Sequence, residues 1–125
     1  MSTKLNDLAN NTQLGASVYP ASVNDTNNGS AVDLLDADGP CFAVQVIGAV
    51  GGTGPSLTGK IQESSDNSTW TDVSGATFTA VTASNNVQTI TFERTKRYVR
   101  HHRTVSGTTP TFLLGALIGE QKKSV

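Results

Sequence analysis

Short apolar segments alternate with polar turns along most of this chain, from residue 31 to residue 119. Within the segments, apolar and polar residues tend to alternate with a period of two, which is typical of β-strands. Turn-forming Gly, Pro, Asn and Asp residues separate the segments. The pattern predicts about seven strands, at Ala31–Leu35, Cys41–Val50, Leu57–Ser64, Ala76–Val81, Val87–Glu93, Arg97–Val105 and Thr111–Gly119. A further short strand is predicted around Trp70.

Two of these segments carry apolar residues on both faces, Cys41–Val50 and Thr111–Gly119. Such strands are expected inside a sheet, with neighbours on both edges. We interpret the glycine-rich run Gly51–Pro55 as a hairpin loop. The layout predicts an all-β fold, an antiparallel, jelly-roll-like β-sandwich of about seven to eight strands.

The two ends of the chain differ from this pattern. Residues 1–30 hold only a few scattered apolar side chains, so we expect an extended N-terminal arm that orders against a neighbouring subunit. Residues 31–119 then form the β-sandwich domain, and residues 120–125 form a polar, frayed C-terminal tail. The arm residues expected to contact a partner are Leu5, Leu8, Leu14 and Tyr19.

At 125 residues the chain fits one domain of ordinary size, and its net charge is −1. The charge is unevenly distributed. Residues 1–92 hold two basic and eight acidic residues, a net charge of −6, whereas residues 93–125 hold seven basic and two acidic residues, a net charge of +5. This polarity favours self-association or docking on a charged protein over general attraction to nucleic acid.

The single cysteine, Cys41, excludes an intramolecular disulfide and is expected to be a small buried hydrophobe. The N-terminus has no apolar core of a signal peptide, and no segment approaches transmembrane length. We therefore expect the protein to be made in a cytoplasm-like compartment and to have no membrane partner.

Residue patterns for catalysis or cofactor binding are sparse. His101 and His102 are adjacent, so on a strand they point to opposite faces and do not readily share a metal. Asp36 and Asp38 resemble the start of a calcium loop, but the closing glutamate is missing, and an ordinary turn explains them better. The chain also lacks a nucleophile elbow, a phosphate-binding loop and a dinucleotide fingerprint. We expect no enzyme activity, no cofactor and no small-molecule substrate.

The densest basic segment runs from Arg94 to Arg103. Arginine pairs well with carboxylates at protein interfaces, so we expect this segment to bind acidic protein surface; nucleic acid is the less favoured alternative. Its candidate partner-binding residues are Arg94, Lys96, Arg97, Arg100 and Arg103.

Trp70, the only tryptophan, lies in a polar turn and offers a platform on which a sugar could stack. A core position is the better interpretation, because tryptophan brings the largest apolar area available to a small sandwich.

Four segments make the chain resemble small virion proteins of tailed bacteriophages, of the head decoration or cement type. They are the apolar strand from Cys41 to Val50, the I-Q-E-S-S-D-N-S-T-W-T-D-V segment from Ile61 to Val73, the T-K-R-Y-V-R stretch from Thr95 to Arg100, and the closing T-V-S-G-T-T-P-T-F-L-L-G-A-L-I-G. The resemblance covers about residues 31–119 and is one of layout, without a catalytic signature.

The resemblance implies a β-sandwich that lies on the capsid surface and binds the major capsid protein. By the same analogy, we expect the chain to form a homotrimer. We therefore expect a virion protein that stabilises the capsid by protein–protein contacts. Two alternatives remain open: a head-completion or tail component of the virion, and a carbohydrate-binding module that uses Trp70.

Overall fold

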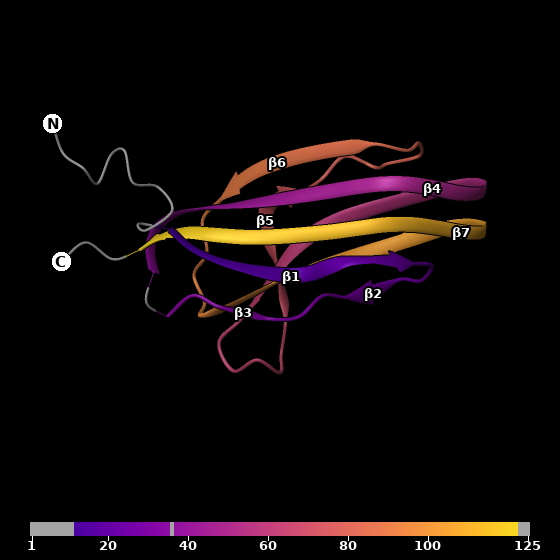
Figure 1. Ribbon diagram of the computed structural model, residues 1–125. Coiled ribbons are helices and arrows are strands. Elements are labelled where there is room, and N and C mark those ends of the chain that lie inside the picture. The colour runs from indigo at the N-terminus through magenta and orange to yellow at the C-terminus, as the bar shows by residue number, and fades with distance from the viewer. Residues whose placement is uncertain (1–11, 36, 123–125) are drawn as a thin grey trace, which may run out of the picture.

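The computed structural model describes residues 12–35 and 37–122, and its secondary structure there consists of β-strands and connecting segments (Figure 1). Two strands are much longer than the others, β4 (Ala37–Ser64) and β7 (Tyr98–Lys122). The remaining strands are β1 (Thr12–Val23), β2 (Asn27–Asn28), β3 (Val32–Asp33), β5 (Thr71–Thr77) and β6 (Asn86–Phe92).

Strands β4 and β7 pair antiparallel along almost their whole length and form the spine of the fold. Their register shifts three times between Ile47 and Ser56, where β4 contains the glycine-rich run Gly51–Pro55. Bulges of this kind bend strands, and Gly52 and Gly54 have positive φ values that glycine adopts without strain. The hairpin loop expected at Gly51–Pro55 was wrong: β4 continues through this run, which bends the ribbon back over itself.

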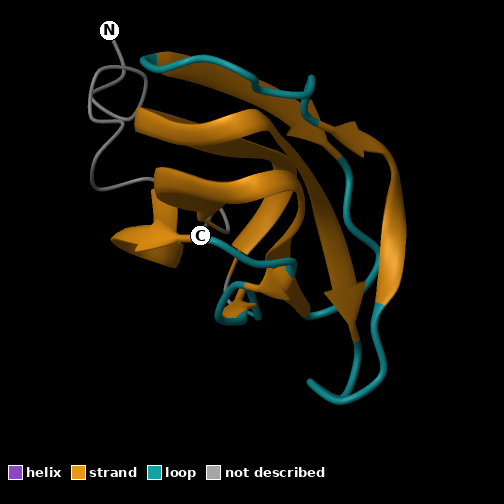
Figure 2. Cartoon of the chain, turned by 90° about the vertical axis from the view of Figure 1, so that its right-hand side faces the viewer, coloured by secondary structure: helices purple, strands orange, loops and turns teal. Residues whose placement is uncertain are grey.

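The bend divides the continuous sheet into two facing layers. In one layer the strand order is β1, the C-terminal half of β7, the N-terminal half of β4, and β6. In the other, β2 and β3 pair with the N-terminal half of β7, followed by the C-terminal half of β4 and then β5. If each half of β4 and β7 counts as a strand, this is a jelly-roll arrangement, and the predicted all-β, sandwich-like class is confirmed (Figure 2).

The core lies between these layers. One cluster of buried residues includes Ala43 and Ile61, which lie far apart on β4 and come together because the strand bends. A hydrogen-bond contact between Gln45 Oε1 and His101 Nε2, 2.8 Å apart, also joins the two layers, and both side chains are fully buried. Gly59 lies against this pair, where a Cβ atom would collide with both side chains.

Parts of the predicted arm and of the predicted tail belong to strands in the structure. Residues 12–23, expected to belong to the arm, form β1 and pair with β7, and Val18 is buried. Two bulges interrupt β1 between Ala16 and Ala21, so its apolar residues do not follow a period of two. Glu120, assigned to the polar tail, is buried within β7. Leu5, Leu8 and Asp36 lie outside the described residues.

A candidate interaction surface

The outer face of the layer formed by β1, β7, β4 and β6 carries apolar and uncharged residues in rows across the strands. Residues paired across a sheet point to the same side, so the strand register defines these rows. We call this surface the apolar face. Its rows are Thr91, Phe42, Gly119 and Leu14; Thr89, Val44, Leu117 and Ala16; Val87, Val46, Gly115 and the adjacent Pro20; and Gly48, Leu113 and Ser22.

None of the residues in these rows is charged. Several of the large side chains are well exposed, with relative exposures of 67% for Val87, 56% for Leu14 and 46% for Leu113. Tyr19, on the bulged part of β1, is 76% exposed. Single exposed apolar residues are common on proteins, but a contiguous apolar face marks a surface that another molecule covers.

Glycines make this face flat. The Phe42 ring lies over Gly119, where a Cβ atom would collide with it. Leu113 leans over Gly48 in the same way, with its Cδ2 atom 3.2 Å from the position of a glycine Cβ. Because the large side chains lie along the sheet, the face suits a flat partner better than an inserted peptide or a small molecule.

The outer face of the opposite layer is charged and polar. Lys60 Nζ lies 3.0 Å from Asp72 Oδ2, and Gln62 donates a 3.1 Å hydrogen bond to the same carboxylate. Next to them, His102 Nδ1 is 2.6 Å from Asn28 Oδ1. We call this surface the charged face. Its side chains satisfy one another, so the molecule has two outer faces of opposite chemical character.

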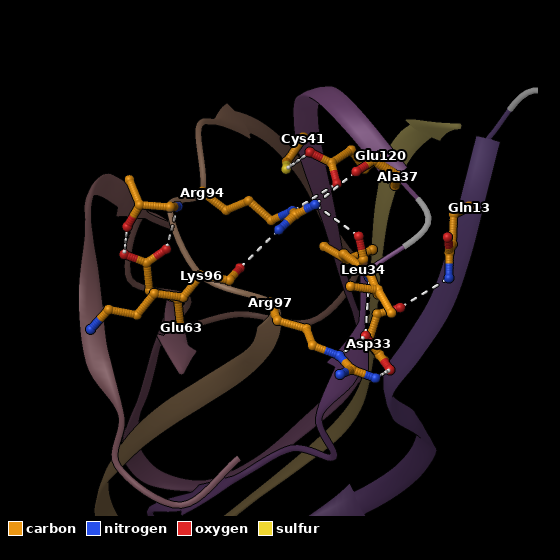
Figure 3. A network of polar contacts seen from close by, with 12 residues as sticks. Gln13, Asp33, Leu34, Ala37, Cys41, Glu63, Arg94, Lys96, Arg97 and Glu120 are labelled. Carbon is orange, nitrogen blue, oxygen red and sulfur yellow. Dashed lines mark hydrogen bonds and ion pairs between the residues drawn. The ribbon is translucent and has the colours of Figure 1, made fainter. Parts of the chain in front are cut away.

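Arg94, predicted to bind a partner, is instead the centre of a buried network (Figure 3). Its Nε atom lies 2.7 Å from Glu120 Oε1, and its two terminal nitrogens donate to the carbonyl oxygens of Lys96, Leu34 and Ala37. The same carboxylate accepts a 3.1 Å hydrogen bond from the Cys41 thiol. This network connects the start of β4 and the segment before it to the turn between β6 and β7 and to the end of β7.

The other basic residues of the predicted segment also have partners within the chain. Arg97 makes two hydrogen bonds to the Asp33 carboxylate, at 2.8 and 2.7 Å. Arg103 is 8% exposed and pairs with Asp25 at 2.8 Å. Lys96 donates to the Thr71 hydroxyl. These contacts pair the basic side chains within the chain, although only Arg94 and Arg103 are largely buried. The sequence could not reveal the pairs because the partners are distant in the chain.

Trp70 is half-buried on the surface, so the expected core position was wrong. The Arg100 guanidinium lies 4.2 Å from the centre of its ring, and Arg100 also donates to Gln62. One face of the indole is therefore covered by a cation. Asp66 holds the preceding turn by accepting hydrogen bonds from the backbone of Thr69 and Ser68, which lowers its pKa to about 2.

The remaining titratable groups fit structural roles. His101 points into the core and His102 points outward, so the two side chains lie on opposite faces, as predicted. Burial raises the pKa of the Cys41 thiol to about 12, which suits the expected inert, buried cysteine. Among the described residues, no group of three or more His, Cys, Asp or Glu side chains is placed to hold a metal ion.

Comparisons with known proteins add little to this picture. No protein family and no curated protein matches the chain. One solved structure, from work on Bacillus endospore appendages described as disulfide-linked pili, matches 90% of both chains with 14% identity and a TM-score of 0.40. This likeness is too weak to support an argument about function. The part of the chain that the structure describes contains no helix long and apolar enough to cross a membrane.

Proposed function

We propose that this chain is a structural protein of a virus particle, of the head decoration or cement type, that stabilises the capsid through protein–protein contacts. The observation that carries the proposal is the apolar face, an uncharged surface built from four strands. An apolar surface of this extent is stable in water only at a cost, so it favours a protein that works in an assembly. The resemblance of residues 31–119 to phage decoration proteins gives the kind of assembly.

The apolar face is suited to this work because it is rigid before it binds. Its residues lie on paired strands, and the central strands β4 and β7 have neighbours on both edges. A partner therefore does not have to order a loop on binding, and little conformational entropy is lost. Contacts distributed over such a platform resist separation of subunits without any chemical step.

The proposed partners are the major capsid protein and further copies of this chain, and the proposed location is the outside of the capsid. The arginine-rich segment contributes through the fold, since Arg94 and Arg103 hold separate segments together. Nucleic acid is a poor partner for it because these guanidinium groups are already paired within the chain.

The test is co-expression with the major capsid protein of the same genome, followed by sedimentation of the assembled shells. We expect this protein to sediment with the shells, in hundreds of copies per particle, and to raise their melting temperature. A head-completion or tail component would instead appear in about a dozen copies per particle. Absence of the protein from every shell fraction would overturn the proposal.

A further inference from the structure

We infer that the apolar face packs against the same face of a second copy of this chain, related by a two-fold axis. This inference deepens the proposed function, because it names the partner of the surface on which that function rests.

The partner must be as free of charge as the apolar face itself. A charged group placed against the rows around Leu117 would lose water without gaining a counter-ion. The charged face cannot supply such a surface, since Lys60, Asp72 and Arg100 project from it. The apolar face of a second copy is the matching surface present on the described molecule. The net charge of −1 also means that two copies repel each other only weakly.

The face is large enough for a specific contact. Four strands spaced about 4.8 Å apart, with about eight residues each at about 3.4 Å, give a footprint on the order of 500 Å² per copy. Two copies together then bury about 1,000 Å², which is near the lower limit for a stable specific interface. Its flat shape, with Phe42 lying over Gly119, suits packing of one sheet on another.

A two-fold arrangement of this face gives a closed assembly of two copies. A face that binds its own copy makes both members of the pair identical in their contacts, and the apolar face of each copy is then covered. A ring of three copies would need two different complementary surfaces, and the described residues offer one apolar face. The charged faces of the dimer then point outward, away from each other.

The test is the mass of the purified protein across a range of concentrations, measured by analytical ultracentrifugation. Two variants place a cation on the apolar face, Leu117→Lys at its centre and Val87→Lys at its strongly exposed margin. The control, Thr104→Lys, adds the same charge at an exposed position of the opposite layer. All three side chains point outward, and far-UV circular dichroism with thermal melting confirms that each variant folds.

We expect a dimer for the natural sequence and for Thr104→Lys, and at least a roughly 100-fold weaker association for both apolar-face variants. A dimer that persists in both variants, or a wild-type trimer or open polymer, overturns the inference. A wild-type protein that stays monomeric at high concentration but sediments with shells overturns the inference and leaves the proposed function standing. A dimer that binds no shell overturns the proposed function and leaves the inference standing.

Discussion

Replacing Arg94 with methionine tests how far one buried guanidinium supports this fold. Arg94 is mostly buried and pairs with Glu120, whose side chain is 2% exposed. The substitution removes the counter-ion of that carboxylate and the donors to the carbonyl oxygens of Leu34, Ala37 and Lys96. Removing one partner of a buried ion pair costs about 3–5 kcal/mol, mainly because the other charge stays buried and unpaired. We expect Arg94→Met to lower the free energy of unfolding by an amount in that range at neutral pH.

Arg97 supplies the matched control, because it forms the same kind of pair in an exposed place. Its side chain and that of Asp33 are 42% and 44% exposed, so solvent screens the interaction. Arg97→Met should therefore cost less than about 1 kcal/mol. A double variant, Arg94→Met with Glu120→Met, should be less destabilised than Arg94→Met alone, since no charge is then left without a partner.

The assay is urea unfolding followed by far-UV circular dichroism, with all variants at one protein concentration because association also adds stability. Equal losses for Arg94→Met and Arg97→Met would refute the reasoning. A double variant that loses the sum of two separate large penalties would also refute it, because it would show that Arg94 and Glu120 do not act as a pair.

Three further predictions follow from the core and from Trp70. Burial, with a smaller contribution from Arg103, lowers the pKa of His101 to about 4 from its ordinary value of 6.5, so the unfolded chain binds the proton first and stability falls as pH drops between these values. The loss should reach about 3 kcal/mol in urea titrations. It should be much smaller in His101→Gln, where only the lowered pKa of His102 still contributes, and should largely persist in His102→Gln. Gly59→Ala should lower the free energy of unfolding by about 1–3 kcal/mol, because the added methyl group collides with Gln45 and His101. Gly115→Ala, whose methyl group meets Pro20 at 3.4 Å, should lower it by less than about 1 kcal/mol, and similar losses in the two variants would contradict this prediction. Trp70→Ala should leave glycan-array binding unchanged, because Arg100 already covers one ring face, and specific glycan binding lost in this variant would support the carbohydrate alternative.

The strand pattern predicted the centre of the fold well. Cys41–Val50 and Thr111–Gly119 read as central strands because both of their faces are apolar, and both lie between paired neighbours. The second apolar side of these two strands also indicates the apolar face. One apolar side of each strand faces the core, and the other side, with Val46, Leu113 and Leu117, faces outward.

Other features depend on contacts between distant residues and could not be predicted locally. The basic segment looked like a docking surface because the partners of Arg94, Arg97 and Arg103 lie 26 to 78 positions away in the chain. Trp70 was placed in the core by its size, whereas its position in a turn keeps it on the surface. The bulges of β1 shift the alternation on which strand prediction depends, so that residues 12–23 looked like an arm.

Hydroxyl-radical footprinting of the natural protein and of Val87→Lys, at equal concentration, tests most directly whether another protein surface covers the apolar face. We expect Leu14, Leu113 and Leu117 to be modified several-fold more slowly in the associated natural protein than in the variant, while Tyr98 and His102 on the opposite layer react equally in both. Equal modification of the three leucines, in solution and on assembled shells, would contradict it.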